Sequence, residues 1–149
     1  RNIVNMELSY FRESWEAGSF GAFLLAREVI KVFLRDKTSG TLLFTGASAS
    51  LRGKANFGAF NSAKGALRNL AQAIAKEYAD NSIHVGHVIV DGGLAGDRIK
   101  NRVPDFNKRV QEGKLIDIES VTDAYMFLYN QNKRAWTFEL DVRTFRENW

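Results

Sequence analysis

Residues 40–67 read GTLLFTGASASLRGKANFGAFNSAKGAL and hold the clearest structural pattern in the chain. The run from Thr41 to Thr45 is short, continuous and mostly apolar, as is typical of a strand buried on both faces. Small residues from Gly46 to Asn56 predict a loop. From Phe57 to Ala79 apolar side chains recur at helical spacing, which predicts a long helix. A strand, a loop and a helix in this order indicate one half of a crossover between parallel strands.

The same alternation continues on both sides of this stretch. Periodicity predicts helices over residues 14–35 and 121–130 and strands over residues 83–90 and 137–142. Asp117 or Ser120 can cap the last helix. The sequence therefore predicts an α/β fold, a Rossmann-like parallel sheet with flanking helices.

The length of 149 residues fits one domain, and no linker or internal repeat divides it. Three strands form a small sheet with a long unpaired edge. The chain begins at Arg1, and residues 2–10 read as an irregular segment. We therefore expect a single partial domain over 1–149 that lacks the first strands of its sheet. It is then a fragment, a trimmed chain or a subunit whose other half is supplied elsewhere.

Composition excludes several classes of function. The chain has no cysteine, so it has no disulfides or thiolate metal sites, and we expect a reducing compartment, the cytoplasm or an organelle matrix. Charged residues interrupt the apolar stretch 20–34, so we expect no membrane span. The net charge is +4, but basic and acidic residues are interleaved, so we expect no nucleic-acid binding. His84 and His87 point to opposite faces of a strand, which predicts no metal site.

The ordered motifs resemble those of the short-chain dehydrogenase/reductase (SDR) family. The resemblance rests on residues 21–24, 40–53, 60–67, 83–93 and 135–141, which together cover nearly the whole chain. It corresponds to the C-terminal half of that family's fold. It implies an NAD(P)-dependent oxidoreductase that transfers hydride on a carbonyl or alcohol.

Three of the four catalytic positions implied by the resemblance depart from the family pattern. The family's Tyr-x-x-x-Lys motif keeps its lysine as Lys64, but Phe60 stands where the tyrosine is expected. The serine position, thirteen residues before Phe60, holds Ala47, with Ser48 beside it. The asparagine position on the preceding helix holds Gly18. The candidate catalytic residues are therefore Lys64, Phe60 and Ser48, in a reaction impaired by the missing hydroxyl.

The resemblance also implies where a cofactor would be held. Lys64 would contact the nicotinamide ribose, and Asp91, Gly92 and Gly93 correspond to the loop beside the nicotinamide; Asp91 could equally cap the turn. No T-G-x-x-x-G-x-G segment occurs in the chain, so NAD or NADP is expected only if the N-terminal half is supplied. Residues 94–116 would be the substrate-covering loop.

Three further expectations concern assembly and charge. Small residues on the helix at 57–79 suit a homo-oligomer, as in the family, or packing on the sheet. The resemblance of residues 21–24 to the family's interface helix implies that the helix at 14–35 takes part in the same contact. The alternative to an enzyme is a non-catalytic, SDR-like structural or interaction subunit of a larger assembly. Glu139 and Asp141 share one side of the last strand, where they would face solvent or an arginine of a partner subunit.

Overall fold

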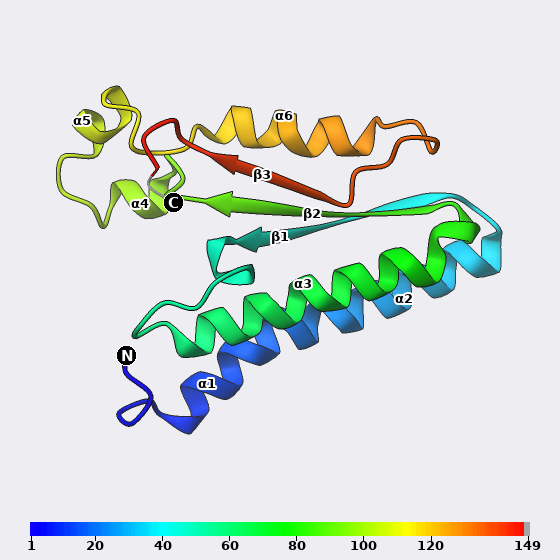
Figure 1. Cartoon of the computed structure of the whole chain (residues 1–149), viewed down its shortest axis with the longest axis horizontal. Helices are drawn as coiled ribbons and strands as arrows, with labels where there is room; N and C mark the ends of the chain where they lie inside the picture. The colour runs from blue at the N-terminus through cyan, green and yellow to red at the C-terminus, as the bar shows by residue number, and fades with distance from the viewer. Residues whose placement is uncertain (148–149) are drawn as a thin grey trace.

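A three-stranded parallel sheet lies between two layers of helices (Figure 1). The computed structural model describes residues 1–147. The strands are β1 (Gly40–Ala47), β2 (Ile83–Asp91) and β3 (Glu139–Arg143), in the order β1-β2-β3. The register places Gly40 beside Ile83 and His87 beside Glu139. The predicted α/β fold with a parallel sheet is confirmed.

Helices α2 (Gly21–Asp36) and α3 (Gly58–Tyr78) lie on one side of the sheet, and α6 (Ile118–Tyr129) lies on the other (Figure 1). Because helices lie on both sides, all but one residue of β2 are buried. The core between α2, α3 and the sheet is formed by Ala26, Ile30, Ala71, Ile74, Ile83 and Val85. Asp117 caps α6, and its carboxylate accepts a hydrogen bond of 2.8 Å from the Ser120 amide.

The prediction for the start of the chain was partly wrong. Residues 2–10 were expected to be irregular, but α1 (Leu8–Trp15) begins within them. None of its residues is buried, although Leu8, Phe11 and Trp15 lie on one face at helical spacing. A π-helical turn, Glu16–Phe20, joins α1 to α2. Such turns are often found at functional sites.

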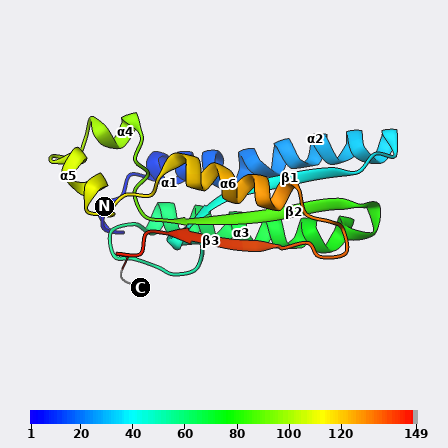
Figure 2. The same ribbon diagram turned by 90° about the horizontal axis from the view of Figure 1, so that it is seen from above.

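The excursion between β2 and α6 folds over the carboxyl ends of the strands. It contains the short helices α4 (Asp97–Lys100) and α5 (Phe106–Gln111), which Figure 2 shows at the same end of the molecule as the chain's N-terminus. Its two ends meet through a parallel bridge between Leu94 and Ile116. The excursion therefore lies at the end of the sheet where the candidate site residues are found.

Within residues 1–147, no helix is both long enough and apolar enough to cross a bilayer.

Candidate active site

The predicted site residues from β1 and α3 gather at the carboxyl end of the sheet. A cavity of about 400 Å³ lies there, and Ser48, Phe60 and Asp91 are among the residues that line it. Ser48 opens a short 3-10 turn directly after β1, and Phe60 lies in the first turn of α3. Carboxyl ends of parallel strands are where open α/β sheets bind ligands. The structure therefore brings two of the three candidate catalytic residues, Ser48 and Phe60, to one cavity, while Lys64 is not among the residues that line it.

Lys64 reaches from α3 back to the end of β1. Its Nζ donates a hydrogen bond of 2.8 Å to the Thr45 carbonyl oxygen. Burial lowers the pKa of this ammonium below its usual value. Nζ also lies 5.9 Å from the centroid of the Phe60 ring, one helical turn earlier on α3. Lys64 is thus half-buried and held in place, unlike a solvated surface lysine.

The two remaining departures from the family pattern have distinct surroundings. Ala47 has no side-chain oxygen, and its backbone N–H donates instead to Ser50 Oγ at 3.2 Å. Gly18 lies in the π-helical turn, where an added Cβ would come within 2.9 Å of the Ala63 Cβ. The close approach of this turn to α3 therefore depends on the absence of a side chain at position 18.

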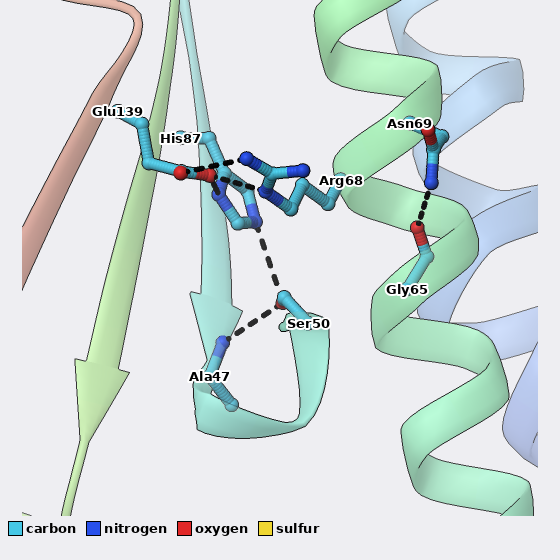
Figure 3. A network of polar contacts seen from close by, with 7 residues as sticks. All are labelled: Ala47, Ser50, Gly65, Arg68, Asn69, His87 and Glu139. Atoms are coloured by element: carbon cyan, nitrogen blue, oxygen red, sulfur yellow. Dashed lines mark hydrogen bonds and ion pairs between the residues drawn. The ribbon is translucent and has the colours of Figure 1, made fainter. Parts of the chain in front are cut away.

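A polar network links four elements beside this site (Figure 3). Arg68 on α3 forms two hydrogen bonds to the Glu139 carboxylate, of 2.6 and 2.9 Å. Glu139 Oε2 also lies 2.9 Å from His87 Nδ1, and His87 Nε2 lies 3.5 Å from Ser50 Oγ. Because a carboxylate only accepts, Nδ1 carries the proton, and Nε2 of the neutral ring accepts from Ser50. The donor direction is therefore set from Ser50 through His87 to Glu139.

The charges in this network shift the pKa of its members. Hydrogen bonds from Arg68 lower the pKa of Glu139. Burial lowers the pKa of His87, although the neighbouring carboxylate of Glu139 opposes that shift. Gly46 makes room for the ring, because a Cβ at this position would collide with His87. In this network His87 is therefore neutral, and Glu139 and Arg68 beside it are charged.

The sequence did not predict this network. Glu139 and Asp141 were expected to face solvent or an arginine of a partner subunit. Asp141 is exposed and lies beside Arg143 of its own chain, whereas Glu139 is partly buried against Arg68 of its own chain. One sequence feature pointed toward this network: Lys64 and Arg68 are four residues apart, so both lie on the same face of α3. Periodicity could not reveal which strand residue this face would meet.

Asp91 is buried at the end of β2 between two guanidinium groups. Its Oδ2 lies 3.3 Å from Arg52 Nη2 and 3.5 Å from Arg143 Nη1. Gly92 has φ +148°, and side chains of the excursion pack against both glycines: Ile116 against Gly92 and Leu115 against Gly93. The predicted cofactor contacts of Asp91, Gly92 and Gly93 stay predictions.

A second and larger cavity lies at the opposite end of the strands. It has a volume of about 610 Å³ and is lined by residues that include Gly40, His84 and Trp136. His84 stacks on Trp136 with 4.9 Å between ring centroids, and its Nε2 lies 3.0 Å from the Thr137 carbonyl oxygen. Since that carbonyl accepts, Nε2 carries the proton. His84 and His87 thus belong to separate structural contacts, and the described residues contain no cluster suited to a metal ion.

Comparison with known proteins places this chain in a family. The family model described as enoyl-(acyl carrier protein) reductase matches residues 1–139. A short-chain dehydrogenase from Rhodopseudomonas palustris is 35% identical, with a TM-score of 0.74 over 96% of this chain and 56% of that one. The chain therefore belongs to the SDR superfamily.

Two further matches are a relative that aligns over a shorter stretch and a solved structure that shares the fold. The uncharacterized oxidoreductase YuxG of Bacillus subtilis (strain 168) is 34% identical over 79 residues, which are 53% of this chain and 12% of that protein. A 4-hydroxyisoleucine dehydrogenase complexed with NADH shares the fold, with a TM-score of 0.75 and 18% identity over 94% of this chain and 61% of its own. The chain thus spans 56% of the length of the Rhodopseudomonas palustris dehydrogenase, 61% of that of the 4-hydroxyisoleucine dehydrogenase and 12% of that of YuxG.

Proposed function

We propose that this chain forms the catalytic half of an NAD(P)-dependent oxidoreductase that acts on a carbonyl or alcohol. The supporting observation is the position of Lys64, whose ammonium lies at the carboxyl end of β1, one helical turn from Phe60. Phe60 in turn lines the cavity at this end of the sheet. Membership in a superfamily of oxidoreductases supports the same reaction class.

The surroundings of Lys64 fit the ribose of a nicotinamide cofactor. One N–H of the ammonium bonds to the Thr45 carbonyl, and an ammonium has three donors, so others can reach ribose hydroxyls. When bound, the cofactor supplies or takes the hydride. Residues 94–116, which fold over this end of the sheet, would cover the substrate and exclude water.

Phe60 limits the proton-transfer part of this reaction. A phenyl ring has no proton to exchange with the substrate oxygen, and Ala47 has no hydroxyl to polarise a carbonyl. A positioned general acid typically contributes about 10²–10⁴ in rate. Ser48, which also lines the cavity, is the hydroxyl we propose as the remaining catalytic candidate.

Binding of reduced nicotinamide mononucleotide (NMNH) tests the cofactor assignment. This probe carries only the nicotinamide and its ribose, so it does not require the pyrophosphate turn that the sequence lacks. We expect saturable binding by NMR, with shifts at the Lys64 amide, and about tenfold weaker binding in Lys64→Met. Lys76→Met, an exposed lysine of the same helix, is the matched control. Absence of NMNH binding at millimolar concentrations would overturn the proposal.

A gain-of-function variant tests the impairment. Phe60→Tyr combined with Ala47→Ser restores both hydroxyls, and we expect it to raise carbonyl reduction with NADPH or NADH by at least about 10². Phe60→Leu combined with Ala47→Ser lacks the phenol and serves as the control. Equal rates in the two double variants would show that the phenyl ring is not what limits the reaction.

The second candidate function is a non-catalytic interaction subunit. The exposed aromatic series Trp15, Phe20 and Phe23 on the α1–α2 side favours it, because such apolar surface marks contact sites. Two measurements distinguish the two functions: an interaction subunit does not bind NMNH, and its Phe60→Tyr/Ala47→Ser variant stays inactive.

We further propose that α2 and α3 form a homo-oligomer contact. A groove of about 310 Å³ between them is lined by Phe23, Arg27 and Lys31 of α2 and by Ala73 and Glu77 of α3. Opposite charges on the two helices would pair across a two-fold axis. Ala73→Arg should lower the mass measured by light scattering, and Asp80→Arg, outside the groove, should not. A monomeric wild-type chain would refute this contact.

A further inference from the structure

Cations surround an aromatic surface in the cavity at the carboxyl ends of the strands. Phe57 and Phe60 line this cavity, and the two residues are 48% and 43% exposed. Lys54 Nζ lies 5.3 Å from the Phe57 centroid, and Lys64 Nζ lies 5.9 Å from that of Phe60. A ligand that lies on these rings therefore has positive charge close to it.

Arg52 adds a guanidinium group to the wall of the same cavity. Its Nη2 lies 3.3 Å from Asp91 Oδ2, and its side chain is 49% exposed whereas that of Asp91 is 5% exposed. A guanidinium has five N–H donors in a planar fork, so one contact leaves most of them available. Arg143 also faces Asp91, at 3.5 Å, and so shares in neutralising this buried carboxylate.

The accessible charge of the lining is positive on balance. Arg52 and Lys54 are both exposed to the cavity, and Asp91 lies buried beneath Arg52. Glu147 is the other carboxylate among the described lining residues. Two accessible cations thus face one accessible anion, and only the guanidinium offers paired parallel donors.

We propose that Arg52 is a specificity-determining residue that binds the carboxylate of a substrate with a small apolar or aromatic body. This inference rests on the proposed function, because it treats the cavity as the substrate end of the oxidoreductase site. A carboxylate accepts two parallel N–H bonds from a guanidinium, and Phe57 and Phe60 supply the apolar surface for the body. Asp91 holds the Arg52 side chain in position from below.

Benzoate and benzamide are the probes that test this inference, because they have the same shape and differ in charge. Titrations of the chain, followed by amide NMR shifts, should show benzoate binding at Arg52, Gly53 and Asn61, and benzamide binding at least about tenfold more weakly. Arg52→Met should weaken benzoate binding about tenfold, while Arg52→Lys should retain part of it. Arg134→Met removes an exposed arginine outside the cavity and should leave the affinity unchanged.

Two results would overturn the inference: equal affinities for benzoate and benzamide, or unchanged benzoate affinity in Arg52→Met. If Arg52→Met alone fails to fold, the double variant Arg52→Met/Asp91→Asn removes both partners and gives the same readout. Neither probe needs a cofactor or turnover. A chain that binds benzoate through Arg52 but does not bind NMNH would therefore refute the proposed function and leave the carboxylate site standing.

Discussion

Replacing Glu139 with Gln tests whether the polar network beside the site holds the sheet and α3 together. The carboxylate accepts two hydrogen bonds from Arg68 and one from His87, while an amide has a single acceptor oxygen and an NH2 group (Figure 3). In Glu139→Gln that NH2 group must face a donor of Arg68 or His87. The variant therefore keeps the shape of the side chain but removes its charge and replaces one of its two acceptor oxygens with a donor.

The expected loss of stability follows from the burial of the three partners. His87 is fully buried, and the side chains of Arg68 and Glu139 are 29% and 23% exposed. Breaking a buried charge pair costs about 3–5 kcal/mol, and partial exposure of this pair lets water replace some of the lost bonds. We expect Glu139→Gln to lower the free energy of unfolding by about 2–4 kcal/mol. That is a large part of the about 5–15 kcal/mol of a typical domain.

Urea denaturation at pH 7.5, followed by circular dichroism, measures this change. Glu13→Gln makes the same chemical change at an exposed position of α1 and should alter stability by less than about 0.5 kcal/mol. Arg68→Met and the double variant complete a cycle, in which we expect a coupling energy of about 1–3 kcal/mol. A loss below about 0.5 kcal/mol for Glu139→Gln would refute the stabilising role of the network.

Three further outcomes are expected. Burial lowers the pKa of His87 below its usual 6.5, so the unfolded chain binds more protons and stability should fall as the pH drops through 6.5. Arg68 lowers the pKa of Glu139, so a second loss of stability should follow below about 4.5. Urea midpoints measured from pH 8 to 4 check both losses, and a midpoint that does not change with pH would contradict them. Gly46→Ala puts a Cβ against His87 and should cost about 1–3 kcal/mol in urea denaturation; a neutral effect would show that the ring can move away. Asp117→Ala removes the α6 cap and should cost about 1 kcal/mol in thermal unfolding, whereas the exposed Asp123→Ala should not.

Most of the fold was predictable because its elements carry strong periodic signals. The strands β1 and β2 contain the apolar runs Leu42–Phe44 and Val88–Val90, and α3 has a stripe of buried small and aliphatic residues. The helix α1 was missed because it is only 8 residues long, and its apolar positions Leu8, Phe11 and Trp15 are too few to establish a helical period. The π-helical turn before α2 has no sequence signal of its own, since its residues also fit an uninterrupted helix.

The candidate site was predictable only in part. Lys64 and Phe60 were found because their spacing is local, four residues along one helix. Arg52 was missed, because its role depends on a cavity formed by residues from β2, α3 and the turn after β1. The ion pairs of Asp91 could not be predicted either, since its two arginine partners come from distant segments of the chain.

The amino-acid sequence by itself determined the α/β class, the order of the elements, and the absence of a hydroxyl at Phe60 and Ala47. Each of these depends on residue identity or on local periodicity. Only the tertiary structure decided that Ser50, His87, Glu139 and Arg68 form one network, and that Arg52 lines the same cavity as Phe57 and Phe60. Such contacts depend on strand register and on the approach of α3 to the sheet. Those quantities are set by packing the whole core together, and no local stretch of sequence encodes them.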